Sequence, residues 1–193
     1  MRKLERLAWQ HSDCEVIALT GDCVKKAAYQ LPAEWSNWPQ PVKLSVPGNH
    51  GDHTHAYDLL TSESWLHKTP WTKEVDDVLF VGIGCGDWGE EIATQLKSLE
   101  YRNYSAVVWL THHRVHPTAD TQLGDFLRKS ALGRKLLLLH GHKHAFEWDD
   151  PSGFPGKAYW RSCVYSGSGN GAGHRITWTG DEFQRDRVEG AED

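Results

Sequence analysis

The residues most able to do chemistry follow short apolar runs in this sequence. The clearest case spans residues 136–144, where four leucines lead into His-Gly-His-Lys-His. Because side chains alternate along an extended backbone, His142 and His144 would lie on the same side of the chain. Neutral imidazole is the commonest metal ligand among protein side chains. The stretch therefore predicts a metal site at the end of a buried strand, with an exposed polar strand exit as the alternative.

Three other apolar runs also end in polar side chains: residues 15–20 before Gly21-Asp22, residues 42–46 before Gly48-Asn49-His50, and residues 106–111 before His112-His113. The polar residues after any one of these runs are weak evidence for a metal site. Asp22, for example, is explained equally well as the N-cap of a helix over 23–30. Together they bring a carboxylate, a carboxamide and imidazoles to one sheet edge, where α/β sheets bind ligands. Such a mixed nitrogen and oxygen set suits a divalent transition metal.

Strands must position these polar residues, and helices must connect the strands. Apolar runs predict the four strands above and a fifth over 77–83, and helical periodicity predicts the connections. The predicted helices cover residues 2–10, 23–30, 56–67, 90–100 and 120–132. Towards the end we expect a strand over 158–165, a turn over 166–173, and a hairpin of 175–178 with 182–188 around Thr179-Gly180-Asp181.

Composition limits the class of protein. The chain has 193 residues, 39% hydrophobic and 24% charged, which predicts a single folded domain over 1–193. The net charge of -5 makes long nucleic acid an unlikely partner. The four cysteines form no paired motif, so free thiols in a reducing compartment are expected. No apolar run is long enough to cross a bilayer, and we expect a cytoplasmic protein.

Taken in order, four motifs resemble the calcineurin-like metallophosphoesterase family: Gly21-Asp22, Gly48-Asn49-His50, Thr111-His112-His113 and Gly141-His142-Lys143-His144. The combined pattern is far more specific than any one motif, and it covers the chain from about residue 15 onward. The resemblance implies a four-layer α/β/β/α sandwich of two mixed β-sheets with a metal site at the strand ends. It also implies divalent transition metals (manganese, iron, zinc or nickel), one or two per chain.

The resemblance further implies a role for each matching residue. Asp22 would bridge two metals, His144 would ligate one of them, and three residues would complete the other site: Asn49, His112 and His142. His50 would contact the phosphate and assist the leaving group or the attacking hydroxide. His112 is preferred over His113 because the first histidine of such a pair is usually the ligand.

The sequence departs from the family pattern at its start. The family opens with a strand followed by Asp-x-His, which supplies two ligands to the metal also held by His144, and no such motif precedes Gly21 here. His11 and Asp13 occur in the reversed order beside a predicted helix, so we assign them no such role. Gly51 also stands where the family usually has an acidic residue. The first strand of the fold is therefore expected to be missing.

Three hypotheses follow. The first is a metal-dependent phosphoesterase that hydrolyses mono- or diesters by metal-activated hydroxide attack, with Asp22 and His50 as catalytic residues. A small diester such as a cyclic nucleotide is preferred as substrate. The second hypothesis is a degenerate relative that acts as a binding or scaffold protein. The third is a fragment whose upstream sequence carries Asp-x-His. Oligomeric state is not readable from the sequence.

Overall fold

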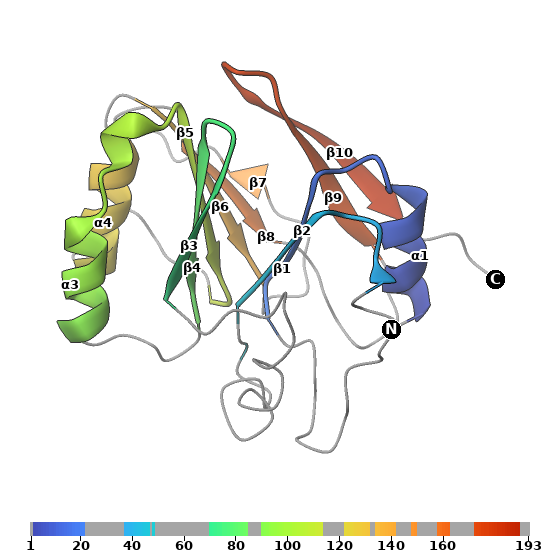
Figure 1. Cartoon of the computed structure of the whole chain (residues 1–193), viewed down its shortest axis with the longest axis horizontal. Helices are drawn as coiled ribbons and strands as arrows, with labels where there is room; N and C mark the ends of the chain where they lie inside the picture. The colour runs from blue at the N-terminus through green and yellow to red at the C-terminus, as the bar shows by residue number, and fades with distance from the viewer. Residues whose placement is uncertain are drawn as a thin grey trace.

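The structure is a computed structural model of the 193-residue chain. It describes residues 2–21, 37–46, 48, 70–84, 90–113, 122–131, 134–141, 148–149, 158–162 and 172–189. The strands form one six-stranded sheet and two separate pairs. Helices lie over one face of the large sheet, and the strand pairs lie over the other (Figure 1).

The central sheet has the strand order β3-β4-β5-β6-β8-β7. Its strands are β3 (Trp71–Val75), β4 (Val78–Ile83), β5 (Ala106–Thr111), β6 (Lys135–His140), β7 (Trp148–Asp149) and β8 (Ala158–Ser162). The four inner strands run parallel, and the edge strands β3 and β7 run antiparallel to their neighbours. The carboxyl ends of the inner strands consequently lie at one edge of the sheet.

The middle strands form where the sequence is almost continuously apolar. Every residue of β5 is buried, and Leu136–Leu139 are buried within β6. Parallel strands covered on both faces require such unbroken apolar runs, since neither face meets water. Helices α3 (Glu90–Ser98) and α4 (Gln122–Ala131) cover one face, and the short 3-10 helix η2 (Tyr101–Asn103) leads into β5.

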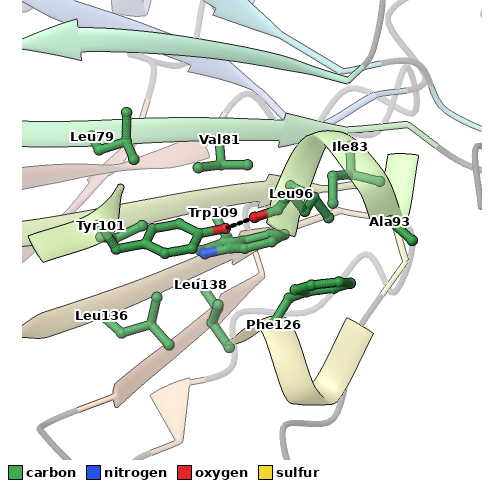
Figure 2. Packing of buried hydrophobic residues seen from close by; sticks show 11 residues of the cluster. Leu79, Val81, Ile83, Ala93, Leu96, Tyr101, Trp109, Phe126, Leu136 and Leu138 are labelled. Carbon is green, nitrogen blue, oxygen red and sulfur yellow. Dashed lines mark hydrogen bonds between the residues drawn. The ribbon is translucent and has the colours of Figure 1, made fainter. Parts of the chain in front are cut away.

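Alternate strand residues meet α3 and α4 in a first core, which we call the helix-face core. Its members are Leu79, Val81, Ile83, Ala93, Leu96, Tyr101, Val107, Trp109, Phe126, Leu136 and Leu138. Figure 2 shows the indole of Trp109 in the middle of this cluster. That indole is fully buried and donates its N–H to Ser130 Oγ of α4 at 3.1 Å. The Tyr101 hydroxyl donates to the main-chain oxygen of Leu96 at 3.4 Å, so the polar groups of both aromatic residues are satisfied inside the core.

Two separate ribbons cover the opposite face of the sheet (Figure 1). One is the parallel pair β1 (Val16–Leu19) and β2 (Val42–Ser45), and the other is the antiparallel pair β9 (Ala172–Trp178) and β10 (Phe183–Glu189). They enclose a second core, the ribbon-face core, with buried members Leu44, Val46, Val78, Ala106, Val108, Leu110, Leu137, Leu139 and Phe183. Val16, Ala18, Ile176 and Trp178 pack against it and are only partly buried.

Helix α1 (Arg2–Gln10) lies beside β9 and buries Leu7 and Ala8. A buried side chain from the segment before β2 fixes the end of this helix. The Gln40 amide donates to the main-chain oxygen of Ala8 at 2.7 Å and to that of His11 at 3.0 Å. The bond to Ala8 satisfies a carbonyl group that a helix leaves without a partner at its carboxyl end, and the His11 oxygen also accepts from the Cys14 N–H at 3.0 Å. Within the described part of the chain, no helix is long and apolar enough to cross a membrane.

Most of the sequence-predicted elements are confirmed. The helix over 2–10, the five predicted strands and the hairpin around residues 179–181 all occur, with the Thr179 N–H donating to the Glu182 oxygen at 3.1 Å. The helices predicted over 23–30 and 56–67 lie outside the described residues, as do residues 163–165 of the strand predicted over 158–165. Residues 172–173, predicted as part of a turn, belong to β9.

The prediction missed two edge strands, β3 and β7. β3 has the sequence Trp-Thr-Lys-Glu-Val and exposes its three middle residues, so it lacks the apolar run that identified the inner strands. Its turn to β4 passes through Asp76, whose φ of 50° is the left-handed conformation that tight hairpins require. The predicted α/β class is confirmed. In place of one continuous second sheet, however, the described residues form the two ribbons; the full four-layer arrangement stays a prediction.

Candidate metal centre

The carboxyl ends of β1, β2, β5 and β6 meet between the large sheet and the β1–β2 ribbon. The Gly141 N–H, just after β6, donates to the main-chain oxygen of His112 at 3.0 Å. The ring nitrogen Nδ1 of His112, just after β5, lies 2.8 Å from the main-chain oxygen of Thr20, which follows β1. Two hydrogen bonds thus link three strand ends that are far apart in the sequence.

Glycines allow these strand ends to approach one another. A Cβ atom at Gly21 would lie 2.5 Å from His112 Nδ1 and 2.8 Å from the Cα of Gly48, and Gly21 has a φ of +94°. A Cβ atom at Gly141 would lie 2.7 Å from the Thr20 oxygen. These separations are too short for any side chain, and the positive φ at Gly21 is readily adopted only by glycine. The glycines after β1 and β6 are therefore required by the packing at this site, and the backbone of Gly48, after β2, packs directly against Gly21.

The side chain of His112 is directed between the two layers of strands. Side chains alternate along β5, and Val108 and Leu110 face the ribbons, so His112 falls on that same face. It is 1% exposed. Because a carbonyl oxygen can only accept, Nδ1 must donate to Thr20, and Nε2 of the neutral ring carries the lone pair. Metal-binding histidines commonly hold their second N–H on a carbonyl in this way, so His112 fits the chemistry of a metal ligand.

Two neighbouring histidines have different surroundings. His113 is exposed, and its main-chain oxygen accepts a hydrogen bond from Thr111 Oγ1 at 2.9 Å. His140 is buried, and by alternation with Leu136 and Leu138 it falls on the helix face of the sheet, where its Nδ1 lies 3.1 Å from the main-chain oxygen of Gly141. Of the histidines at these two strand ends that the structure describes, His112 alone faces the ribbons.

Most of the predicted site residues fall outside the described residues: the ligands Asp22, Asn49, His142 and His144 and the catalytic His50. Three of them, Asp22, Asn49 and His142, follow directly in sequence after the closely packed glycines Gly21, Gly48 and Gly141. Among the residues that the structure describes, no three histidine, cysteine, aspartate or glutamate side chains come together as a metal-binding group. The ligand roles assigned from the sequence remain predictions.

The sequence interpretation gave no role to Thr20. Its main-chain oxygen fixes the ring of His112, and its side-chain hydroxyl is buried without a hydrogen-bond partner in the structure. A buried hydroxyl without a partner costs free energy unless a ligand or water satisfies it. The sequence feature that could have identified Thr20 is its position between an apolar run and Gly21-Asp22.

No protein-family model matches the chain, and no curated protein matches its sequence significantly. A solved structure does match: the sulfate thiohydrolase SoxB of Thermus thermophilus, in complex with glycerol, with a TM-score of 0.58 and 15% sequence identity. The match covers 97% of this chain and 42% of SoxB, so the chain spans less than half the length of that protein. The fold is metallophosphoesterase-like. The resemblance inferred from the sequence motifs thus holds at the level of the fold.

Proposed function

We propose that this protein is a metal-dependent hydrolase of phosphate esters. The observation that carries the proposal is the meeting of four strand ends at His112, whose hydrogen bond from Nδ1 to Thr20 places the lone pair of the neutral ring on Nε2, the atom that would bind a metal. Side chains with metal-binding chemistry follow directly in sequence after the three glycines packed around this point. The structural neighbour is itself a hydrolase by name, which agrees with this class of reaction.

In this proposal Asp22 bridges two metal ions. Asn49, His112 and His142 complete the site of one, and His144 ligates the other. A divalent metal bound there would supply a Lewis acid for the phosphoryl group and lower the pKa of a coordinated water. His50 would hold the phosphate and move a proton to or from the reacting oxygens.

The proposed substrate is a small phosphate mono- or diester, with a small diester preferred. The net charge of -5 disfavours long polyanions, since nucleic-acid binding depends on many cationic contacts to phosphates. A small ester needs only the local positive charge of a metal centre.

The test is to measure metal content by elemental analysis and hydrolysis of bis-p-nitrophenyl phosphate, with and without added manganese. The informative variant is His112→Asn, because the asparagine amide can still donate to the Thr20 oxygen but has no group in place of Nε2. We expect it to lose bound metal and to lose more turnover than the ~10–100-fold that removing an outer-shell partner of a metal costs. His113→Asn, at the exposed neighbour, is the matched control and should keep both.

Thermal melts and circular dichroism establish that each variant is folded. A folded His112→Asn protein with wild-type metal content and turnover would contradict the proposal. A folded wild-type protein that binds no metal and shows no turnover would contradict it too, and would favour the binding-protein hypothesis.

A further inference from the structure

The side chain of Thr20 is enclosed at the point where the strand ends meet. It is 1% exposed and follows directly after β1. Val16 and Ala18 pack against the ribbon-face core, and by alternation Thr20 falls on the same side of the chain. Its Oγ1 would lie 3.0 Å from a Cβ atom at Gly141, so the hydroxyl is directed at the end of β6. A threonine of the small ribbon thus reaches the large sheet.

The ring of His112 lies at the same point. A Cβ atom at Gly141 would be 2.7 Å from the main-chain oxygen of Thr20 and 3.4 Å from His112 Nδ1. The Thr20 main-chain oxygen accepts the hydrogen bond from Nδ1 at 2.8 Å. The main-chain oxygen and the hydroxyl of Thr20 therefore both lie beside Gly141, next to the ring nitrogen that orients the candidate ligand.

The hydroxyl of Thr20 differs from that of Thr111, the last residue of β5. Both side chains are buried, and Thr111 Oγ1 donates to the main-chain oxygen of His113 at 2.9 Å. Thr20 Oγ1 has no hydrogen-bond partner in the part of the chain that the structure describes. Because a buried hydroxyl without a partner costs free energy, the Thr111 hydroxyl contributes to folding and the Thr20 hydroxyl does not.

Two other buried side-chain oxygens also lack partners within the described residues, and they lie elsewhere. Gln40 Oε1 belongs to the amide that binds the end of α1. Ser45 Oγ lies on β2, where Leu44 and Val46 face the ribbon-face core, so by alternation Ser45 falls on the opposite face of the ribbon. Of these three oxygens, that of Thr20 is directed into the candidate metal centre.

We propose that Thr20 is a positioning residue of this centre, whose hydroxyl donates to an oxygen ligand of the bound divalent cation. The inference rests on the function proposed above, because it needs a bound cation. Oxygen ligands of metals are held by outer hydrogen bonds of this kind, which orient them and tune the metal. The side chain is 1% exposed, so an oxygen inside the centre suits it better than a substrate that enters from solvent. Thr20 then orients His112 through its main-chain oxygen and an oxygen ligand through its hydroxyl.

The test compares two variants of Thr20. Thr20→Val removes the hydroxyl and keeps the shape of the side chain, and Thr20→Ser keeps the hydroxyl. The probe is Co²⁺ added to the metal-free full-length protein, because its visible absorption reports both binding and ligand geometry. Thr20→Val should bind Co²⁺ ~10–100-fold more weakly, the cost of removing an outer-shell partner, with shifted absorption bands. Thr20→Ser should restore both. Thr177→Val, at an exposed position of β9, is the matched control and should behave as wild type.

Urea denaturation of the metal-free proteins separates this role from a structural one. Thr20→Val should unfold at a urea midpoint no lower than that of wild type, because its hydroxyl donates to no group of the described chain. Thr111→Val should unfold at a lower midpoint, since it removes a hydrogen bond that the fold uses. A threonine with a purely structural role would lose stability and metal affinity together.

Three results would overturn the inference. The first is a lower urea midpoint, or a failure to fold, for Thr20→Val. The second is wild-type Co²⁺ affinity and absorption in folded Thr20→Val, which would remove Thr20 from the centre and leave the proposed function standing. The third is Co²⁺ binding as weak in Thr20→Ser as in Thr20→Val, which would assign the effect to packing. A folded wild-type protein that binds no Co²⁺ would contradict the proposed function, and the inference with it.

Discussion

The two faces of the central sheet are packed differently. On the helix face, Val81 and Trp109 are completely buried beneath α3 and α4. On the ribbon face, Phe80 and Trp178 stay partly exposed beside a cavity of about 400 Å³. A helix covers a sheet without needing a strand partner of its own, whereas a ribbon leaves an edge unpaired on each side.

This difference matters for the candidate site, because the site joins the well-packed part to the poorly packed part. His112 and Gly141 belong to the large sheet, and Thr20 and Gly21 belong to the end of β1. The large sheet can hold His112 in place on its own. The partner that orients its ring comes from the ribbon, so loosening of the ribbon should affect metal binding before it affects the helix-face core.

The largest expected effect is in the helix-face core. Trp109→Ala should lower the free energy of unfolding by roughly 3–5 kcal/mol, since it empties a fully buried site and leaves Ser130 without its indole partner. Trp178→Ala should cost less, because Trp178 is partly exposed and the cavity beside it is already open. Urea denaturation at pH 7 measures both. Equal losses would contradict the contrast drawn between the two faces.

A smaller effect is expected from glycines. Gly141→Ala would drive a Cβ atom against the Thr20 oxygen and should cost about 1–3 kcal/mol, as overpacking does. Gly180→Ala has open space and only the strain of its φ of +88°, and should cost about 1 kcal/mol. Metal content separates the two variants further. Gly141→Ala should reduce it by shifting the Thr20–His112 contact, and Gly180→Ala should not; a reduction in both would argue against a local cause.

The smallest expected effect is at the exposed ion pair that links β9 to the start of β1. The hydrogen bond from Arg175 holds the pKa of the Asp13 carboxyl below its ordinary value of 3.8. Because the folded-state pKa is the lower one, the stabilisation is complete above pH ~4 and is lost as the pH falls through the folded-state value. Asp13→Asn should lower the melting temperature slightly at pH 7 and low salt, and the difference should vanish near pH 2 and at high salt. A difference that grows on acidification would exclude this pair as its source.

Local sequence patterns were sufficient to predict the inner strands of the large sheet. The unbroken apolar runs over 106–111 and 136–139 predict strands buried on both faces, and both are present as β5 and β6. The exposed edge strand β3 could not be found in this way, because its pairing with β4 depends on main-chain hydrogen bonds rather than on apolar side chains. The cavity was equally unpredictable, since its walls come from β1 and β9, separated by most of the chain.

Some features of the candidate site could likewise be read from the sequence, and others depend on the tertiary structure. The sequence by itself determined which residue types follow each strand, and that glycines precede Asp22, Asn49 and His142. The tertiary structure decided that the strand ends actually meet, that His112 rather than His113 faces the ribbons, and that Thr20 sets the tautomer of its ring. Residue type and alternation are local properties of the chain, whereas the choice of Thr20 as hydrogen-bond partner depends on a contact across 92 positions. Only the packing of the whole chain creates such contacts.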